Sequence, residues 1–194
     1  MNGKTEEITI KNVKQEKKEE EKVMKEKKSE MATAYHEAGH AVVALRTHYA
    51  PKPKKISIIP IPDERILSEV SYYKRMFDEN GYFQPVEEKR IQCSIMSLFA
   101  GEIAEKKFTG RNDHVGSQTD FDNAIKYGEL LYTTGLLGDL FDWLSVLTEA
   151  IVNKYWHEIE KVAEVLLEKK TLSGKELKEI IISTMTGPEI NVTT

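Results

Sequence analysis

The chain has 194 residues, of which 40% are hydrophobic and 31% charged, a composition typical of one globular domain with a highly charged surface. Its formal net charge of −4 argues against a nucleic-acid-binding surface, which needs an excess of basic residues. The single cysteine, Cys93, excludes an internal disulfide framework and a cysteine-rich zinc finger, and it fits a reducing compartment. We interpret Cys93 as a buried core thiol in an apolar helix.

Membrane-directed segments are not apparent in the sequence. The charged N-terminus is followed by no apolar block of the kind that a signal peptide needs. The most apolar windows, residues 41–45 and 136–147, are too short or too interrupted to span a bilayer. We therefore expect no membrane partner and a cytoplasmic location.

Residues 1–30 form a charged N-terminal extension with nine Lys and eight Glu. Its apolar positions within residues 7–13 are compatible with a short strand, and the Lys/Glu run beyond them with a solvated helix or a loose arm. We interpret the whole segment as a solubilising extension rather than a regulatory or docking arm.

Residues 31–185 are predicted to form one mainly α-helical domain with a small β element, and residues 186–194 a C-terminal tail. A helix with one apolar face begins at Glu30 and is ended by Pro51 and Pro53. Two strands are predicted next, at residues 55–59 and 67–73. The remaining predicted helices cover residues 86–108, 120–131, 140–154, 158–169 and 173–183, the last with a capped start.

Residues 36–40 read His-Glu-Ala-Gly-His, the motif H-E-x-x-H, within the best helical pattern of the chain. Residues four apart share one side of a helix, so His36 and His40 could hold one zinc ion at about 2.0–2.1 Å from each nitrogen. Glu37, one step round the helix, is predicted as the general base that takes a proton from the zinc-activated water. Two alternatives stay open for the motif alone: a pair of surface histidines, and a zinc site without catalysis.

A catalytic zinc site needs a third protein ligand. The extended form H-x-x-G-x-x-H is excluded by residues 41–45, and no E-x-x-x-D pattern supports the glutamates that follow, which are Glu64, Glu69 and Glu79. Asp120 is the attractive candidate because it follows the turn at residues 116–119 and opens a predicted helix. On physical grounds alone, Asp120 is an N-cap residue before it is a ligand.

Several blocks of the sequence, spread over most of residues 24–183, resemble the peptidase domain of the FtsH family of membrane-anchored, ATP-dependent zinc proteases. The similar blocks are residues 34–42 around the motif, 55–60, 100–110, 116–120 and 165–176. The resemblance implies a helical zinc metallopeptidase fold with zinc ligands at His36, His40 and Asp120 and the catalytic base at Glu37. It further implies that the carboxylate of Glu105 does not bind the metal but orients one of the histidine ligands.

The sequence also departs from the family's pattern. Ala100-Gly101-Glu102 stands in place of Gly-Gly-Arg, and the turn before Asp120 is one residue shorter. The family's glycine-bearing hairpin, replaced here by residues 61–67, leads into an edge strand that aligns substrate. We assign that role to the predicted second strand, with the substrate-facing candidates Leu67, Glu69, Val70 and Tyr72.

The three histidines outside the motif and the aromatic residues are further candidates for a functional role. His48 lies two turns beyond His40, too far to share its metal ion. His114 could line the cleft and steady a tetrahedral intermediate, although an ordinary loop histidine is the favoured interpretation, and His157 is interpreted as a surface residue. The aromatic residues of the C-terminal half are interpreted as helix packing: Phe141, Trp143, Tyr155 and Trp156.

These observations predict a stand-alone zinc metallo-endopeptidase that hydrolyses unfolded proteins or peptides. We expect it to be ATP-independent in itself, because Gly174-Lys175 is followed by Glu rather than by the Ser or Thr of a P-loop. One alternative is a zinc-binding adaptor or regulatory relative without turnover, against which intact Glu37 argues. Another is a zinc hydrolase of non-peptide amides. A separate ATPase and further copies of the chain stay open as partners.

Overall fold

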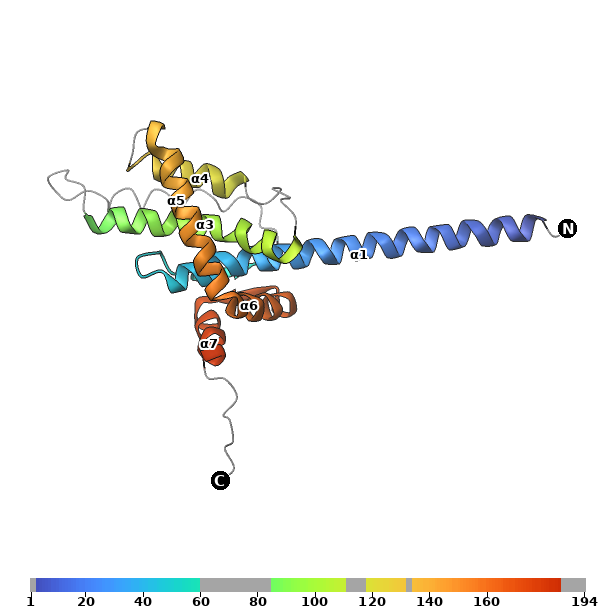
Figure 1. Cartoon of the computed structure of the whole chain (residues 1–194). Coiled ribbons are helices and arrows are strands. Elements are labelled where there is room, and N and C mark those ends of the chain that lie inside the picture. The colour runs from blue at the N-terminus through green and yellow to red at the C-terminus, as the bar shows by residue number, and fades with distance from the viewer. Residues whose placement is uncertain (1–2, 60–84, 111–117, 132–133, 186–194) are drawn as a thin grey trace, which may run out of the picture.

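The computed structural model describes residues 3–59, 85–110, 118–131 and 134–185, and within these it is mainly helical (Figure 1). In chain order the elements are α1 (Gly3–Arg46), β1 (Lys55–Ser57), α3 (Pro85–Thr109), α4 (Gln118–Gly128), the short 3₁₀ helix η1 (Thr134–Leu136), α5 (Leu137–Lys154), α6 (Trp156–Lys169), β2 (Thr171–Ser173) and α7 (Gly174–Met185). The described part of the chain includes no helix long and apolar enough to cross a membrane.

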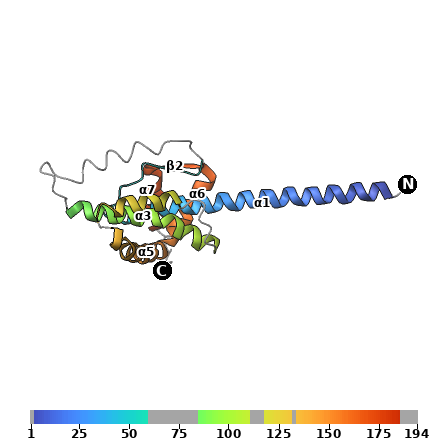
Figure 2. The same cartoon turned by 90° about the horizontal axis from the view of Figure 1, so that it is seen from above.

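Helix α1 is unbroken over 44 residues, and its N-terminal half projects from the body of the molecule (Figures 1 and 2). The short strand predicted at residues 7–13 is therefore wrong. Alternating apolar positions favoured a strand locally, but Lys and Glu are good helix formers and the segment contains no proline. The predicted boundary at residue 30 falls inside this helix.

The C-terminal half of α1 is the centre of the packed core. Helix α3 packs along one side of it and α6 along another, and α5 crosses both α1 and α3 (Figure 1). The α1 side chains in this core are small and fully or almost fully buried: Ala34, Ala38, Ala41, Val42 and Val43. Small side chains let neighbouring helices approach closely, and that close approach defines the geometry of the site below.

Two features end α1 and attach it to the rest of the fold. The Lys52 ammonium donates to the carbonyl oxygens of Ala44 and Thr47 at 2.7 and 2.6 Å, which satisfies C-terminal carbonyls that lack helical partners. Arg46 pairs with the buried Glu158 of α6 through two hydrogen bonds, one of them 2.8 Å from Nε to Oε2. The end of the helix is thereby fixed against α6.

The β element is an antiparallel pair in which Ile56 of β1 lies opposite Leu172 of β2. Strand β1 confirms the strand predicted at residues 55–59, whereas β2 was not predicted. The capped start of α7 is confirmed: the Ser173 amide donates to Glu176 Oε2 at 2.9 Å, and the Glu176 amide donates to Ser173 Oγ at 3.3 Å. This reciprocal capping box turns the chain from β2 into α7.

The five helices predicted after residue 85 are confirmed, with ends that differ by a few residues. Two packing predictions are wrong. Trp143 is 52% exposed because it lies off the buried face of α5 that Leu140 and Leu144 define, and Cys93 is only half-buried. Phe141, Tyr155 and Trp156 do pack against the core as predicted. The strand predicted at residues 67–73 lies outside the described residues.

Candidate metal centre

Both histidines of the H-E-x-x-H motif lie on the packed half of α1, on the side that faces α3. Their ring centroids are 4.6 Å apart and their planes are inclined at 85°. His36 is buried, with 6% of its surface exposed, and His40 is partly buried. The four-residue spacing therefore brings the two imidazoles together as the sequence predicts.

A row of residues on α3 faces these two rings. Ser97, Gly101 and Glu105 are spaced four apart and so share one side of the helix. The Ser97 carbonyl accepts a 2.6 Å hydrogen bond from His40 Nδ1, and Glu105 Oε2 lies 3.1 Å from His36 Nδ1. Each imidazole is thus held at Nδ1 by a group on α3, which orients its Nε2 atom toward the space between the helices.

Two glycines make this approach possible. A Cβ atom at Gly101 would lie 2.5 Å from His40 Nε2 and 2.7 Å from His36 Nε2, so no larger residue fits without moving a ring. A Cβ atom at Gly39 would lie 2.4 Å from the Ala100 carbonyl oxygen, which belongs to the backbone and cannot rotate away. The helices can lie this close only because neither glycine carries a side chain.

Asp120 comes from the first turn of α4 and completes the cluster. Its Oδ2 atom lies 3.1 Å from His36 Nε2 and 3.3 Å from His40 Nε2. Helix α4 begins at Gln118, two residues before Asp120, so Asp120 does not occupy the N-cap position that its sequence context suggested. Its carboxylate is directed at the two imidazoles, and the three donor atoms lie within 4.8 Å of one another.

The electrostatics of the cluster reflect this convergence. Burial opposes the charge on His40, but the hydrogen bond and the charge of Asp120, with the charge of Glu37, together raise the pKa of His40 to about 9. Burial would raise the pKa of Asp120, yet its contacts with the two histidines hold that pKa well below its usual range. The space between the imidazoles and the carboxylate therefore favours a positive charge.

The donor set fits a zinc ion. The Ser97 carbonyl can only accept, so His40 Nδ1 carries the proton, and a neutral ring directs the lone pair of Nε2 at Asp120. A lone pair and a carboxylate oxygen 3.3 Å apart repel each other unless a proton or a metal cation lies between them. Two imidazole nitrogens and one carboxylate oxygen are a usual ligand set of catalytic zinc.

Access to the cluster is uneven. The His36 side chain is 8% exposed, whereas the side chains of His40 and Asp120 are 19% and 22% exposed. The cluster therefore opens to solvent on the side of His40 and Asp120. Glu37 is partly buried, and within the described residues its carboxylate makes no hydrogen bond, which leaves it available as a proton acceptor.

The structure thus brings together four residues singled out from the sequence, His36, His40, Glu105 and Asp120. Sequence reasoning missed the contribution of Ser97, because a backbone carbonyl leaves no mark on residue identity. It noted Gly101 as part of a block that resembles a family pattern, without recognising the close contact that requires a glycine there. His114 and the substrate-strand candidates lie outside the described residues.

The two other candidate histidines lie apart from this cluster. His48 follows the end of α1, where its ring lies edge-on to Tyr49 with the centroids 4.9 Å apart. His157 belongs to the first turn of α6. Neither belongs to the group of possible metal ligands found among the described residues.

Comparisons with known proteins relate the chain to a family of peptidases. A family model described as "Peptidase family M41" matches residues 22–133. The chain is 26% identical over 172 residues to an ATP-dependent zinc metalloprotease FtsH 3 of Phytoplasma mali, a match that covers 78% of this chain and 27% of that protein. It is 28% identical over 190 residues to an ATP-dependent zinc metalloprotease FtsH of Leptotrichia buccalis, which covers 76% of this chain and 22% of that protein.

A third relative, the ATP-dependent zinc metalloprotease FtsH of Rickettsia felis, is 26% identical over 192 residues, with 79% of this chain and 29% of that protein covered. The chain therefore spans less than a third of the length of these relatives. A helical domain that presents two histidines and an aspartate to one point belongs to the class of domains equipped to bind a metal ion. Within that class, the chain belongs to peptidase family M41.

Proposed function

We propose that this chain is a zinc metallo-endopeptidase whose metal is held by His36, His40 and Asp120. The observation that carries the proposal is the convergence of His36 Nε2, His40 Nε2 and Asp120 Oδ2, with Glu37 directly after His36 on the same helix. Zinc supplies Lewis-acid chemistry at such a site, since it lowers the pKa of water toward 7 and polarises a carbonyl.

Glu37 is the general base of the proposed reaction. Its carboxylate accepts a proton from the attacking water, whose oxygen bonds to the scissile carbonyl carbon. Glu37 then gives that proton to the leaving nitrogen as the C–N bond breaks, which yields a free amine and a carboxylic acid that releases its remaining proton to water. The charge of Glu37 contributes to the raised pKa of His40, so its carboxylate lies in the neighbourhood of the cluster.

Glu105 and Ser97 position the histidines and take no part in the proton transfers. Glu105 fixes the ring of His36 through Nδ1, and the Ser97 carbonyl fixes the ring of His40. Acceptors behind metal-bound imidazoles set their tautomer and orientation, and their loss typically costs about 10–100-fold in metal affinity or activity.

The proposed substrates are unfolded proteins or peptides, because a peptide bond reaches a buried catalytic cluster only when the chain around it is extended. An extended peptide binds well to the edge of a strand, and residues 67–73, with Leu67, Glu69, Val70 and Tyr72, stay the proposed partner strand. Hydrolysis by the residues above consumes no nucleotide, so we propose that cleavage of unfolded chains is ATP-independent. A separate ATPase would be needed only to unfold a folded substrate.

The deciding experiment compares Glu37→Gln with the wild type in zinc content and in hydrolysis of unfolded casein. The variant is expected to keep about one zinc per chain and to lose about 10²–10⁴-fold in rate. Glu26→Gln is the matched control, since it makes the same change on an exposed part of α1 and should leave the rate unchanged. Equal rates for Glu37→Gln and the wild type would show that Glu37 is not the base. A zinc-loaded wild type that hydrolyses nothing would favour the alternative function, a zinc-binding adaptor or regulatory protein without turnover.

A further inference from the structure

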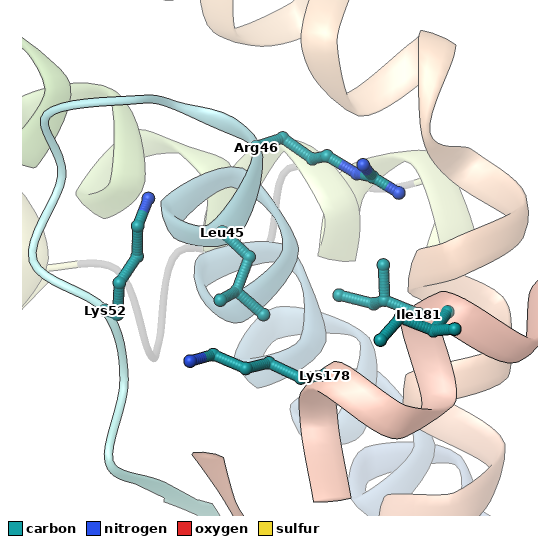
Figure 3. A pocket seen from close by; sticks show the side chains of 6 residues that line it. Leu45, Arg46, Lys52, Lys178 and Ile181 are labelled. Carbon is teal, nitrogen blue, oxygen red and sulfur yellow. The ribbon is translucent and has the colours of Figure 1, made fainter. Parts of the chain in front are cut away.

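A second concave site lies where the end of α1 meets α7. It has a volume of about 310 Å³ and is lined by Leu45, Arg46, Lys52, Lys178, Ile181 and Ile182 (Figure 3). That volume is at the lower end of the range for small-molecule sites, about 300–1,000 Å³. Leu45 follows His40 by five residues, or about 140° round a helix of 3.6 residues per turn, so the pocket opens on a face of α1 turned away from the metal centre.

The walls of the pocket separate charge from apolar surface. Figure 3 shows the ammonium groups of Lys52 and Lys178 on one side of Leu45 and the side chain of Ile181 on the other. The guanidinium of Arg46 points away from the lysines, in keeping with its hydrogen bonds to Glu158. One end of the pocket therefore carries the two lysine ammonium groups, and the other carries Ile181 together with an arginine that is already paired with Glu158.

The two lysines carry positive charge that the described part of the chain does not balance. Lys52 donates to the backbone carbonyls of Ala44 and Thr47, whose partial negative charge at the end of α1 offsets only part of the charge of an ammonium group, and Lys178 has no carboxylate partner among the described residues. Burial lowers the pKa of Lys52, and the nearby charge of Lys178 lowers it further. Two like charges beside a pocket repel each other, and a bound anion would relieve that repulsion.

The lining also excludes several kinds of ligand. It holds no aromatic ring on which a nucleobase could stack. Its walls come from the last turn of α1, the segment after it and the middle of α7, and the free carbonyls at the end of α1 already accept hydrogen bonds from Lys52. An extended peptide would find few partners for its amides there. A ligand with one anionic head and a plain hydrocarbon body meets every feature of the lining.

We propose that this pocket binds an aliphatic carboxylate of medium chain length, with its head at Lys52 and Lys178 and its chain against Leu45, Ile181 and Ile182. The site is separate from the metal centre and does not depend on the proposed peptidase activity. Binding can therefore be measured without turnover, on the full chain with zinc present or removed.

The test is a titration of the full chain with decanoate below its micellar concentration, followed by calorimetry and by the NMR signals of isoleucine methyl groups. Saturable binding should shift the methyl signals of Ile181 and Ile182. Affinity should rise about fourfold per added methylene from hexanoate until the chain fills the pocket. Decanol, which has the same chain without the charge, should bind at least about tenfold more weakly.

Lys178→Gln should weaken decanoate binding by about 10–100-fold, the usual effect of losing a charge-assisted hydrogen bond. The matched control is Lys175→Gln, one turn earlier on α7, where the side chain is 87% exposed and pairs with Glu179. The proposal is overturned by no saturable binding, by equal binding of decanol, by unchanged affinity in Lys178→Gln, or by shifts confined to other methyl groups. A short peptide with a C-terminal isoleucine that binds more tightly than decanoate would also overturn it.

Discussion

Gly101→Ala is the sharpest test of the metal centre, because the change adds one methyl group at the point where α3 meets both imidazoles. The new carbon would lie 2.5 Å from His40 Nε2 and 2.7 Å from His36 Nε2, whereas ordinary contact begins at 3.4 Å. Each ring would have to move by roughly 0.7–0.9 Å to relieve the overlap. Zinc sites tolerate departures of only about 0.2 Å from ideal ligand distances, so both ligands would be displaced well beyond that limit.

The expected result is a loss of zinc affinity of at least about 100-fold. This equals or exceeds the largest effect of removing a hydrogen-bond acceptor that orients a metal-bound imidazole. Stability of the metal-free protein should change much less. Replacing glycine by alanine within a helix stabilises the folded state by up to about 1 kcal/mol. This offsets part of the destabilisation caused by overpacking, which is about 1–3 kcal/mol. Zinc competition with a chelator measures the first effect, and urea unfolding of the metal-free protein measures the second.

Gly138→Ala is the control, because a Cβ atom at Gly138 meets no other atom within 4 Å. It should bind zinc as the wild type does. A Gly101→Ala variant that also binds zinc within about threefold of the wild type would refute the reasoning, since it would place the metal away from the two Nε2 atoms.

Three further predictions follow from the same contacts. Asp120→Ala should reduce zinc content sharply while the protein stays folded, and full retention of zinc measured by atomic absorption would reopen the search for the third ligand. Zinc binding at pH 7.5 should release about one proton, because the pKa of His40 is raised to about 9 in the metal-free protein. Calorimetry that detects no proton release on zinc binding would contradict this prediction. The raised pKa of His40 also stabilises the metal-free fold, and this stabilisation is full below about pH 6.5 and is lost as the pH rises through 9. Gly39→Ala should lower the free energy of unfolding by about 1–3 kcal/mol, because its methyl group would force the Ala100 backbone away, and an unchanged thermal midpoint would be the contrary result.

The sequence predicted the parts of the site that depend on local spacing. Two histidines four residues apart on a helix must share a side, and His36 and His40 do. Asp120 and Glu105 were assigned through resemblance to a family, because no local rule brings residues 84 and 69 positions away from His36 to the same ring. The contact with the Ser97 carbonyl could not be predicted, since every residue has such a group.

The errors in the fold predicted from the sequence have similar causes. Strand β2 is only three residues long and is stabilised by pairing with β1, more than a hundred residues earlier in the chain. Its own composition carries little signal for a strand of that length. Residues 7–13 were misjudged for the opposite reason, because a local alternation of apolar residues was weighed above the helix-forming composition around it.

The three predicted ligands are not held with equal rigidity. His36 and His40 are fixed by an antiparallel match of two helices, in which the row from Ser97 to Glu105 meets the row from His40 to His36. Asp120 belongs to neither helix, and its placement depends on how α4 packs.

An aromatic link supplies that placement. The ring of Phe141 on α5 contacts Phe99 of α3 at 5.4 Å and Phe121 of α4 at 6.0 Å between centroids. It therefore joins the helix that orients the histidines to the residue directly after Asp120. Gly128 lets α4 approach the same ring, since a Cβ atom there would lie 3.1 Å from Phe141 Cε1. The position of the proposed third ligand is thus set by hydrophobic packing at α5, so we expect metal affinity to depend on a part of the core that touches none of the donor atoms.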